Sequence, residues 1–94
     1  MSSKDEIKRV HIIIYGLVQG VNFRYYTRAK AEELNLTGFV RNNYDGTVEI
    51  EAEGEEGVLN KLIEFVKVGP SLSRIDNIEI HWHDIKKDQG FRVL

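Results

Sequence analysis

Residues 37–54 read TGFVRNNYDGTVEIEAEG, and this stretch decides the fold because it predicts a β-hairpin. An Asp-Gly pair tolerates positive φ, so the turn is expected at residues 43–46. In the returning half, residues 48–53, apolar side chains alternate with glutamates. Such alternation predicts a strand with one buried and one solvated face, which is typical of an antiparallel sheet.

The segments before the hairpin predict a central strand and an amphipathic helix. Residues 7–15, IKRVHIIIY, end in a run of β-branched, apolar residues at both odd and even positions. Both faces of this strand are therefore expected to be covered, as in a strand inside a sheet. Residues 23–36, FRYYTRAKAEELNL, place apolar side chains at helical spacing. Asn22 is expected to cap the start of this helix, and Asn35 to take the left-handed conformation at its end.

A second helix and two strands are predicted after the hairpin. Residues 55–70, EEGVLNKLIEFVKVGP, carry an apolar stripe that stops at a Gly-Pro pair. Residues 75–83, IDNIEIHWH, alternate again, and a short strand, FRVL, follows at residues 91–94. This order predicts an α+β fold, the ferredoxin-like βαββαβ sandwich. We expect a mostly antiparallel sheet of four to five strands with both helices on one face, and the hairpin partner filling the gap between two parallel strands.

Length and composition restrict the class of protein. The 94 residues suffice for one domain, expected at residues 7–94 after a flexible tail at residues 1–6. The chain has no cysteine, which excludes disulfides and thiolate metal sites. Its net charge of -2 gives no electrostatic footprint for nucleic acid, and its longest apolar run, residues 10–18, is too short to span a bilayer. We therefore expect a monomeric, cytoplasmic protein that binds neither nucleic acid nor membrane.

The loop between the first strand and the first helix has a sequence that suits an anion, IYGLVQGVNFR at residues 14–24. A helix N-terminus carries unpaired backbone N–H groups and a partial positive charge. Gly16 and Gly20 allow the backbone to approach a ligand closely, and Arg24 offers a planar guanidinium to phosphate oxygens. An ordinary strand-to-helix turn with a solvated arginine explains the same spacing, so both interpretations stay open. The Walker loop and the dinucleotide fingerprint do not fit.

Two stretches of the sequence resemble the signatures of the acylphosphatase family. Residues 14–24 match an aliphatic residue, any residue, and then G-x-V-Q-G-V-x-F/M-R at every fixed position. Residues 38–54 match the second signature, with GFVRN first, GTV after three free positions, and a glycine at the end. The resemblance covers nearly the full length of the chain. The family's fold is the same ferredoxin-like sandwich that the periodicity predicts.

The resemblance implies an enzyme that hydrolyses the carboxyl-phosphate bond of acyl phosphates to a carboxylate and inorganic phosphate. Arg24 matches the family's phosphate-binding arginine, and Asn42 matches the asparagine that orients the attacking water. The backbone amides implied to hold the phosphate are those of Leu17, Val18, Gln19, Gly20 and Val21. The side chain of Gln19, unlike its amide, is expected to face solvent. No metal and no cofactor are implied, and the expected partners are an acyl phosphate and inorganic phosphate.

Two other functions use the same fold. A non-catalytic anion-binding or regulatory module would keep the loop without hydrolysis, as in the acylphosphatase-like domains within larger hydrogenase-maturation proteins. An RNA-binding sheet would expose aromatic and basic side chains on its open face. Here that face is predicted to carry glutamates and histidines, which argues against RNA.

The remaining polar and aromatic side chains are expected to be structural. The acidic row on the open face, expected to be solvated, consists of Glu49, Glu51 and Glu53. His81 and His83 share one face of a strand and could bind a metal with a third ligand from another strand, such as Glu49 or Glu51. An ordinary exposed polar face is the favoured interpretation. His11 is expected to be a satisfied structural residue. Tyr25 and Tyr26 are expected to pack, with Tyr25 bordering the anion site.

Overall fold

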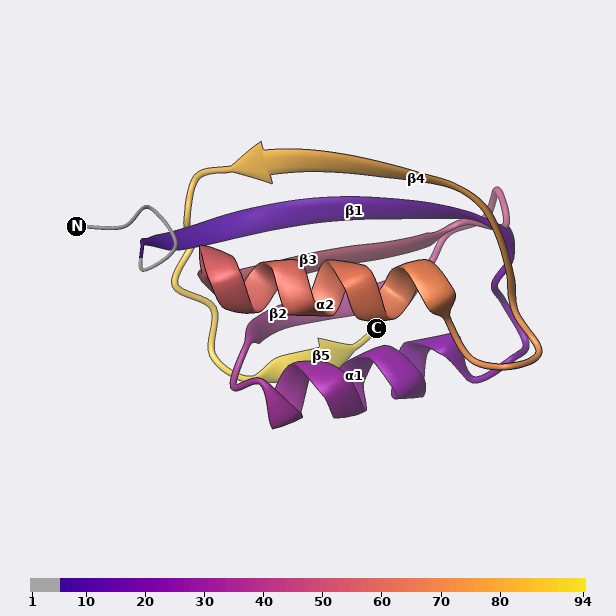
Figure 1. Cartoon of the computed structure of the whole chain (residues 1–94), viewed down its shortest axis with the longest axis horizontal. Coiled ribbons are helices and arrows are strands. Elements are labelled where there is room, and N and C mark those ends of the chain that lie inside the picture. Colours follow the sequence, from indigo (N-terminus) through magenta and orange to yellow (C-terminus); the bar gives the residue numbers. More distant parts are fainter. Residues whose placement is uncertain (1–5) are drawn as a thin grey trace.

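Five β-strands form one sheet, and both α-helices lie against the same face of it (Figure 1). The computed structural model describes residues 6–94, so the tail expected at residues 1–6 lies outside the described residues except for Glu6. In chain order the elements are β1 Ile7–Leu17, α1 Phe23–Glu33, β2 Thr37–Asn42, β3 Val48–Glu55, α2 Glu56–Val68, β4 Arg74–His83 and β5 Phe91–Val93. Neither helix of the described part combines the length and the apolar character that crossing a bilayer requires.

The strand order is β4-β1-β3-β2-β5, a ferredoxin-like sheet with an added edge strand. β3 pairs antiparallel with both β1 and β2, so β1 and β2 run parallel with β3 between them. β4 is antiparallel to β1, whereas β5 pairs with β2 in parallel. The predicted α+β architecture is confirmed, including the hairpin partner that fills the gap between the two parallel strands.

The core lies between the sheet and the helices, where the apolar faces of the strands pack against the apolar faces of the helices. From β1 the fully buried side chains are Val10, Ile12 and Ile14. From the helices the buried side chains are Phe23, Thr27 and Ala31 of α1 and Leu59, Leu62, Ile63 and Val66 of α2. Because burial of apolar surface is the main favourable term in folding, this interface holds the two layers together.

The ends of α1 agree with the prediction at its C-terminus and differ from it at its N-terminus. α1 ends at Glu33, and Asn35 takes the expected left-handed conformation, with φ 58°. Asn22 directly precedes the helix but makes no side-chain capping hydrogen bond, so the predicted cap is wrong. An N-cap side chain reaches the first helical amides from an extended backbone. Asn22 instead has φ 62°, which removes that geometry.

The face of the sheet away from the helices is only partly solvated. Glu51 and Glu53 are 9% and 5% exposed and Glu49 is half-buried, so the expectation of a solvated acidic row is wrong. The cause is Arg9 of β1, which is 1% exposed. Arg9 Nε donates to Glu51 Oε1 (2.5 Å), and its Nη1 donates to Glu53 Oε2 (2.7 Å). Charges become stable in a buried position when they are paired in this way.

The segment between β4 and β5 covers this ionic cluster. Asp88 of that segment accepts a hydrogen bond from Arg9 Nη1 (3.0 Å), and the amides of Lys86 and Lys87 donate to the Glu53 carboxylate. Burial by itself would raise the pKa of Glu53, but these amides and Arg9 together hold its pKa below the ordinary value. Strand alternation correctly assigns the glutamates to this face, but it carries no information about a distant segment that folds over them.

We expect Arg9→Met to lower the free energy of unfolding by about 3–5 kcal/mol, because it leaves buried carboxylates without their partner. Urea unfolding followed by circular dichroism at neutral pH measures the change. Arg28→Met is the matched control, since Arg28 lies on the exposed surface of α1 with its Nε 3.7 Å from Glu32 Oε1. Exposed pairs of this kind contribute little. Equal effects of the two substitutions would contradict a structural role for the cluster.

Candidate active site

The loop between β1 and α1 turns through two residues with positive φ. Gly20 has φ 76° and Asn22 has φ 62°, a conformation that glycine adopts freely and asparagine tolerates. The side chain of Val18 anchors the loop in the core, where it is 1% exposed. Phe23, at the start of α1, is also buried. The buried side chains of Val18 and Phe23 therefore hold the loop in place at the end of the sheet.

Gly16 and Gly20 are needed for different reasons. A Cβ at Gly16 would lie 2.0 Å from the carbonyl oxygen of Arg74 in β4, so close strand packing requires this glycine. The expectation that Gly16 brings the backbone toward a ligand is therefore corrected. A Cβ at Gly20 would meet no protein atom within 4 Å. The positive φ of Gly20 accounts for the glycine there, and its backbone stays open to a ligand.

A cavity of about 150 Å³ lies beside this loop, and both predicted catalytic residues contribute to its wall. Arg24, from the first turn of α1, and Asn42, the last residue of β2, both line it. From the loop, Val18 and Gly20 line it as well. The other predicted phosphate-binding residues do not line the cavity: Leu17 is the last residue of β1, and Gln19 and Val21 lie in the loop.

The two neighbouring tyrosines behave differently. Tyr25 lines the cavity and is 57% exposed, so it borders the candidate site as expected but is not a packing residue. Tyr26 does pack, with its ring stacked on Phe65 of α2 at a centroid distance of 4.3 Å. This contact links α1 to α2 and so fixes the helix that carries Arg24.

The amides of the loop are available to an acceptor. Within residues 6–94, the N–H groups of Val18, Gln19, Gly20 and Val21 donate no backbone hydrogen bond. Asn22 adds no side-chain cap, so the first turn of α1 keeps its unpaired N–H groups too. Unpaired amides at the N-terminus of a helix attract anions through both their hydrogen bonds and the helix dipole. The cavity therefore has the geometry of a site for a small anion.

Arg24 is held in place by the strand at the edge of the sheet. Its Nη1 donates to the main-chain oxygen of Leu94 (2.8 Å), and the Leu94 amide donates to the carbonyl of Val40 in β2 (2.9 Å). β5 therefore connects the arginine of α1 to the strand that ends at Asn42. The sequence contains no signal for this contact, because a three-residue strand does not reveal its partner.

Asn42 lies where β2 passes into the hairpin turn, and the turn is internally bonded. The Asn43 amide donates to the carbonyl of Thr47 (2.9 Å), and Asp45 Oδ1 accepts from the amide (3.0 Å) and hydroxyl (2.6 Å) of Thr47. These hydrogen bonds, that of the hydroxyl first, lower the pKa of Asp45. The predicted turn at residues 43–46 is confirmed, and it fixes the backbone next to Asn42.

The Gln19 side chain ties the loop to this hairpin. Its Nε2 donates to the carbonyl oxygens of Asn43 (2.8 Å) and Thr47 (2.8 Å). The expectation that Gln19 faces solvent is therefore wrong. The loop and the turn meet at the same end of the sheet, toward the right of the view in Figure 1. The family signature contains this glutamine. Its acceptors are backbone carbonyls, however, and every residue has one, so the sequence does not indicate which residues Gln19 binds.

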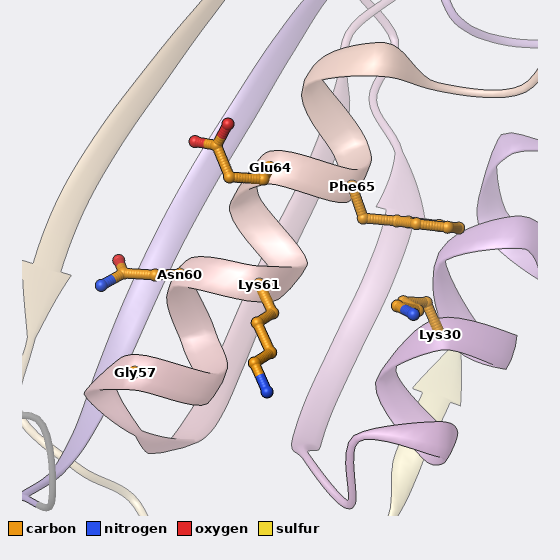
Figure 2. Close-up of a pocket in the computed structure, with 6 residues that line it drawn as sticks. All are labelled: Lys30, Gly57, Asn60, Lys61, Glu64 and Phe65. Carbon is orange, nitrogen blue, oxygen red and sulfur yellow. The ribbon is translucent and has the colours of Figure 1, made fainter.

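A larger hollow of about 550 Å³ lies between the two helices, and it does not carry the same chemistry. Figure 2 shows the Phe65 side chain reaching from α2 toward Lys30 of α1, whereas Asn60 and Glu64 point away from the space between the helices. Lys30 is already paired with Glu33 (2.7 Å). None of the predicted site residues lines this hollow.

The sheet topology and this cavity together define a small α+β domain whose loop amides, arginine and asparagine suit phosphoryl chemistry. A sequence model of the acylphosphatase family matches residues 10–93. An acylphosphatase of Salinibacter ruber is 47% identical over 87 residues, which are 92% of this chain and 92% of that protein. An acylphosphatase of Caldanaerobacter subterraneus is 47% identical over 87 residues, 92% of this chain and 97% of that protein. The chain belongs to the acylphosphatase family.

Solved structures agree with this assignment. The crystal structure of acylphosphatase from Bacillus subtilis is similar with a TM-score of 0.90 and 36% identity, covering 93% of this chain and 98% of that one. Full-length HypF in its phosphate- and nucleotide-bound form is similar with a TM-score of 0.89 and 39% identity, covering 95% of this chain but 12% of that one. A bacterial light-regulated adenylyl cyclase, at a TM-score of 0.66 and 18% identity, shares the fold alone. The fold therefore hosts several functions, and the site has to distinguish them.

We expect Gln19→Ala to lower the free energy of unfolding by about 1–2 kcal/mol, since it removes two hydrogen bonds of modest net strength. It should also weaken binding of inorganic phosphate, because the loop loses its link to the hairpin. Urea unfolding and an NMR titration with phosphate measure the two effects. Gln89→Ala, at an exposed position between β4 and β5, is the matched control. Unchanged phosphate affinity in Gln19→Ala would contradict a positioning role for this side chain.

Proposed function

We propose that this protein hydrolyses acyl phosphates, cleaving the bond between the carboxyl oxygen and phosphorus to release a carboxylate and inorganic phosphate. The observation that carries the proposal is the single cavity lined by Arg24, Asn42 and the β1–α1 loop. Membership of the acylphosphatase family supports the same activity. The cavity is small, so it takes the phosphoryl group, while the acyl part of the substrate extends past the exposed ring of Tyr25.

The loop amides and Arg24 bind the phosphoryl group. The N–H groups of residues 17–21 donate to its oxygens, as the unpaired state of most of them allows. Arg24 adds a positive charge and a planar pair of donors, and its hydrogen bond to Leu94 restricts the orientation of the guanidinium. In phosphoryl transfer the negative charge spreads over the non-bridging oxygens of the transition state. Fixed donors around these oxygens stabilise that charge without reorganising.

Asn42 orients the attacking water. Its amide can hold a water molecule in line with the bond that breaks, but it cannot remove a proton. The water oxygen forms the new bond to phosphorus, and the acyl carboxylate leaves with the electron pair of the broken bond. The proton of the water passes to a phosphate oxygen of the substrate. The residues that line the cavity include no carboxylate and no histidine, which agrees with a reaction assisted by its own substrate.

The leaving group explains why so few side chains suffice. A carboxylate is a stable anion, so its departure needs no strong general acid. Positioning and charge stabilisation supply most of the acceleration in phosphoryl transfer. The proposed reaction is accordingly independent of metal ions and of cofactors, and hydrolysis of benzoyl phosphate in the presence of EDTA tests it. Phosphate binding without hydrolysis would mean that the protein is the non-catalytic anion-binding module instead.

We also propose that residues 7–94 act as one monomeric domain in the cytoplasm, without a nucleic-acid partner. The single sheet and its shared core support one domain. The slightly negative net charge supports the lack of a nucleic-acid partner, and the absence of cysteine suits the cytoplasm.

Arg24→Ala should remove phosphate binding and lower turnover by about 10³-fold or more, the scale of a single arginine that stabilises a phosphoryl-transfer transition state. Benzoyl phosphate hydrolysis and product inhibition by inorganic phosphate measure the two effects. Arg28→Ala, one turn further along α1 and exposed, is the matched control. Inhibition by phosphate that is the same in Arg24→Ala and in the unaltered protein would disprove the assignment.

Asn42→Ala should leave phosphate inhibition largely intact while it lowers kcat by about 10²-fold, the effect of losing one positioned polar group. The separation of binding from turnover distinguishes a water-orienting residue from a phosphate-binding one. Steady-state kinetics with benzoyl phosphate give both parameters, and Asn60→Ala on the exposed side of α2 is the control. Near-normal kcat in Asn42→Ala would remove this residue from the mechanism.

A further inference from the structure

All three histidines of the chain lie together on the open face of the sheet, away from the helices and from the acylphosphatase cavity. His11 of β1 is the register partner of His81 in β4, and His83 follows two residues later on the same face. The ring centroid of His11 is 6.2 Å from that of His81 and 5.2 Å from that of His83. Sequence spacing showed the pair in β4, whereas the third imidazole comes from the neighbouring strand.

A carboxylate fixes the orientation of the central histidine. His11 Nε2 lies 2.6 Å from Glu49 Oε2, and the other carboxylate oxygen of Glu49 accepts from Arg41 Nε (2.9 Å). Ligating histidines in metal sites commonly use their second ring nitrogen in this way, to a carboxylate that sets the tautomer and the ring orientation. His11 can therefore keep its contact with Glu49 through one nitrogen and offer the other to a metal ion.

The acidic row places one further carboxylate, that of Glu51, near His11, but Glu51 is already hydrogen-bonded to Arg9. The His11 ring nitrogen and the carboxylate oxygens of Glu49 and Glu51 all lie within 4.8 Å of one another. Glu51, however, accepts the buried hydrogen bond from Arg9 Nε. Withdrawing it would leave the buried Nε of Arg9 without its acceptor, although Nη1 would keep Glu53 and Asp88. The three imidazoles, rather than Glu51, are therefore the available ligands.

A shared transition-metal ion would require the side chains to rotate, because among the described residues the nitrogens of the three histidines do not all lie within 4.8 Å of one another. Three histidine nitrogens with an open fourth position form a common protein zinc site, with Zn–N distances of about 2.0–2.1 Å. Two histidines at alternate positions of one strand point to the same side, and a register partner on the next strand completes a triangle. The His81 side chain is 58% exposed and His83 is also exposed, so both can turn toward a shared ion without disturbing the core.

We propose that the open face of the sheet binds one divalent ion of the Zn²⁺ class through His11, His81 and His83, with Glu49 orienting His11. The sequence pattern required a third ligand from another strand, such as Glu49 or Glu51. The structure places His11 of β1 in that position. The site is separate from the cavity that holds Arg24 and Asn42, so the proposed hydrolysis and its resistance to EDTA do not depend on it.

Calorimetric titration of the full chain, prepared without an affinity tag, with Zn²⁺ tests the proposal. We expect one saturable site per chain and a higher melting temperature with Zn²⁺ present, because an ion that binds the folded state stabilises it. Titration with Co²⁺ should give visible absorption bands of a low-coordinate ion. The double variant His81→Gln, His83→Gln should weaken binding by more than about tenfold, since even changes outside the ligand set cost about that much.

Two controls give each result a definite meaning. Glu64→Gln removes an exposed carboxylate of α2 on the other side of the sheet and should leave the binding unchanged. His11→Asn tests the central ligand, and the double variant of exposed residues decides the question if His11→Asn does not fold. The absence of saturable binding up to millimolar Zn²⁺ would overturn the proposal. Equal affinity of the double variant and the unaltered protein would overturn it as well.

Discussion

Strand β1 is hydrogen-bonded on both sides, to β3 and to β4, and the rest of the structure depends on this double pairing. The strand sends Val10, Ile12 and Ile14 into the core below the helices. Its other face carries Arg9 and His11, and its end leads directly into the β1–α1 loop. A shift of register by one residue would exchange these two faces. The buried isoleucines and the buried arginine therefore select one register together, and that register places the loop.

The candidate site is assembled at one end of the sheet from segments that are distant in the sequence. The loop supplies unpaired amides, α1 supplies Arg24, and the end of β2 supplies Asn42. Two hydrogen-bonded links hold these parts together, one from Gln19 to the hairpin and one from Arg24 to Leu94. Because catalysis of phosphoryl transfer depends on position, such links matter as much as the groups that contact the substrate.

The two faces of the sheet are stabilised by different interactions. The helix-covered face is apolar, whereas the opposite face contains the ion pairs of Arg9 and the histidine cluster around Glu49. In the buried Arg9 cluster each carboxylate requires a hydrogen-bond donor from the protein, because water is excluded. The segment between β4 and β5 supplies some of these donors through its backbone amides, and the same segment leads into β5, which pairs with β2.

The sequence by itself determined the element order, the fold class, the turn at residues 43–46 and the family, because these depend on local periodicity, turn chemistry and two long signatures. It also placed Arg24 near the start of a helix and Asn42 at the end of a strand, where the structure has them. Only the tertiary structure decided that Glu51 and Glu53 are buried, that Gln19 binds the hairpin, that Gly16 makes room for β4, and that His11 joins His81 and His83. Each of these depends on contacts between residues far apart in the chain, and a single sequence records the residue types at both ends of such a contact without recording that they meet.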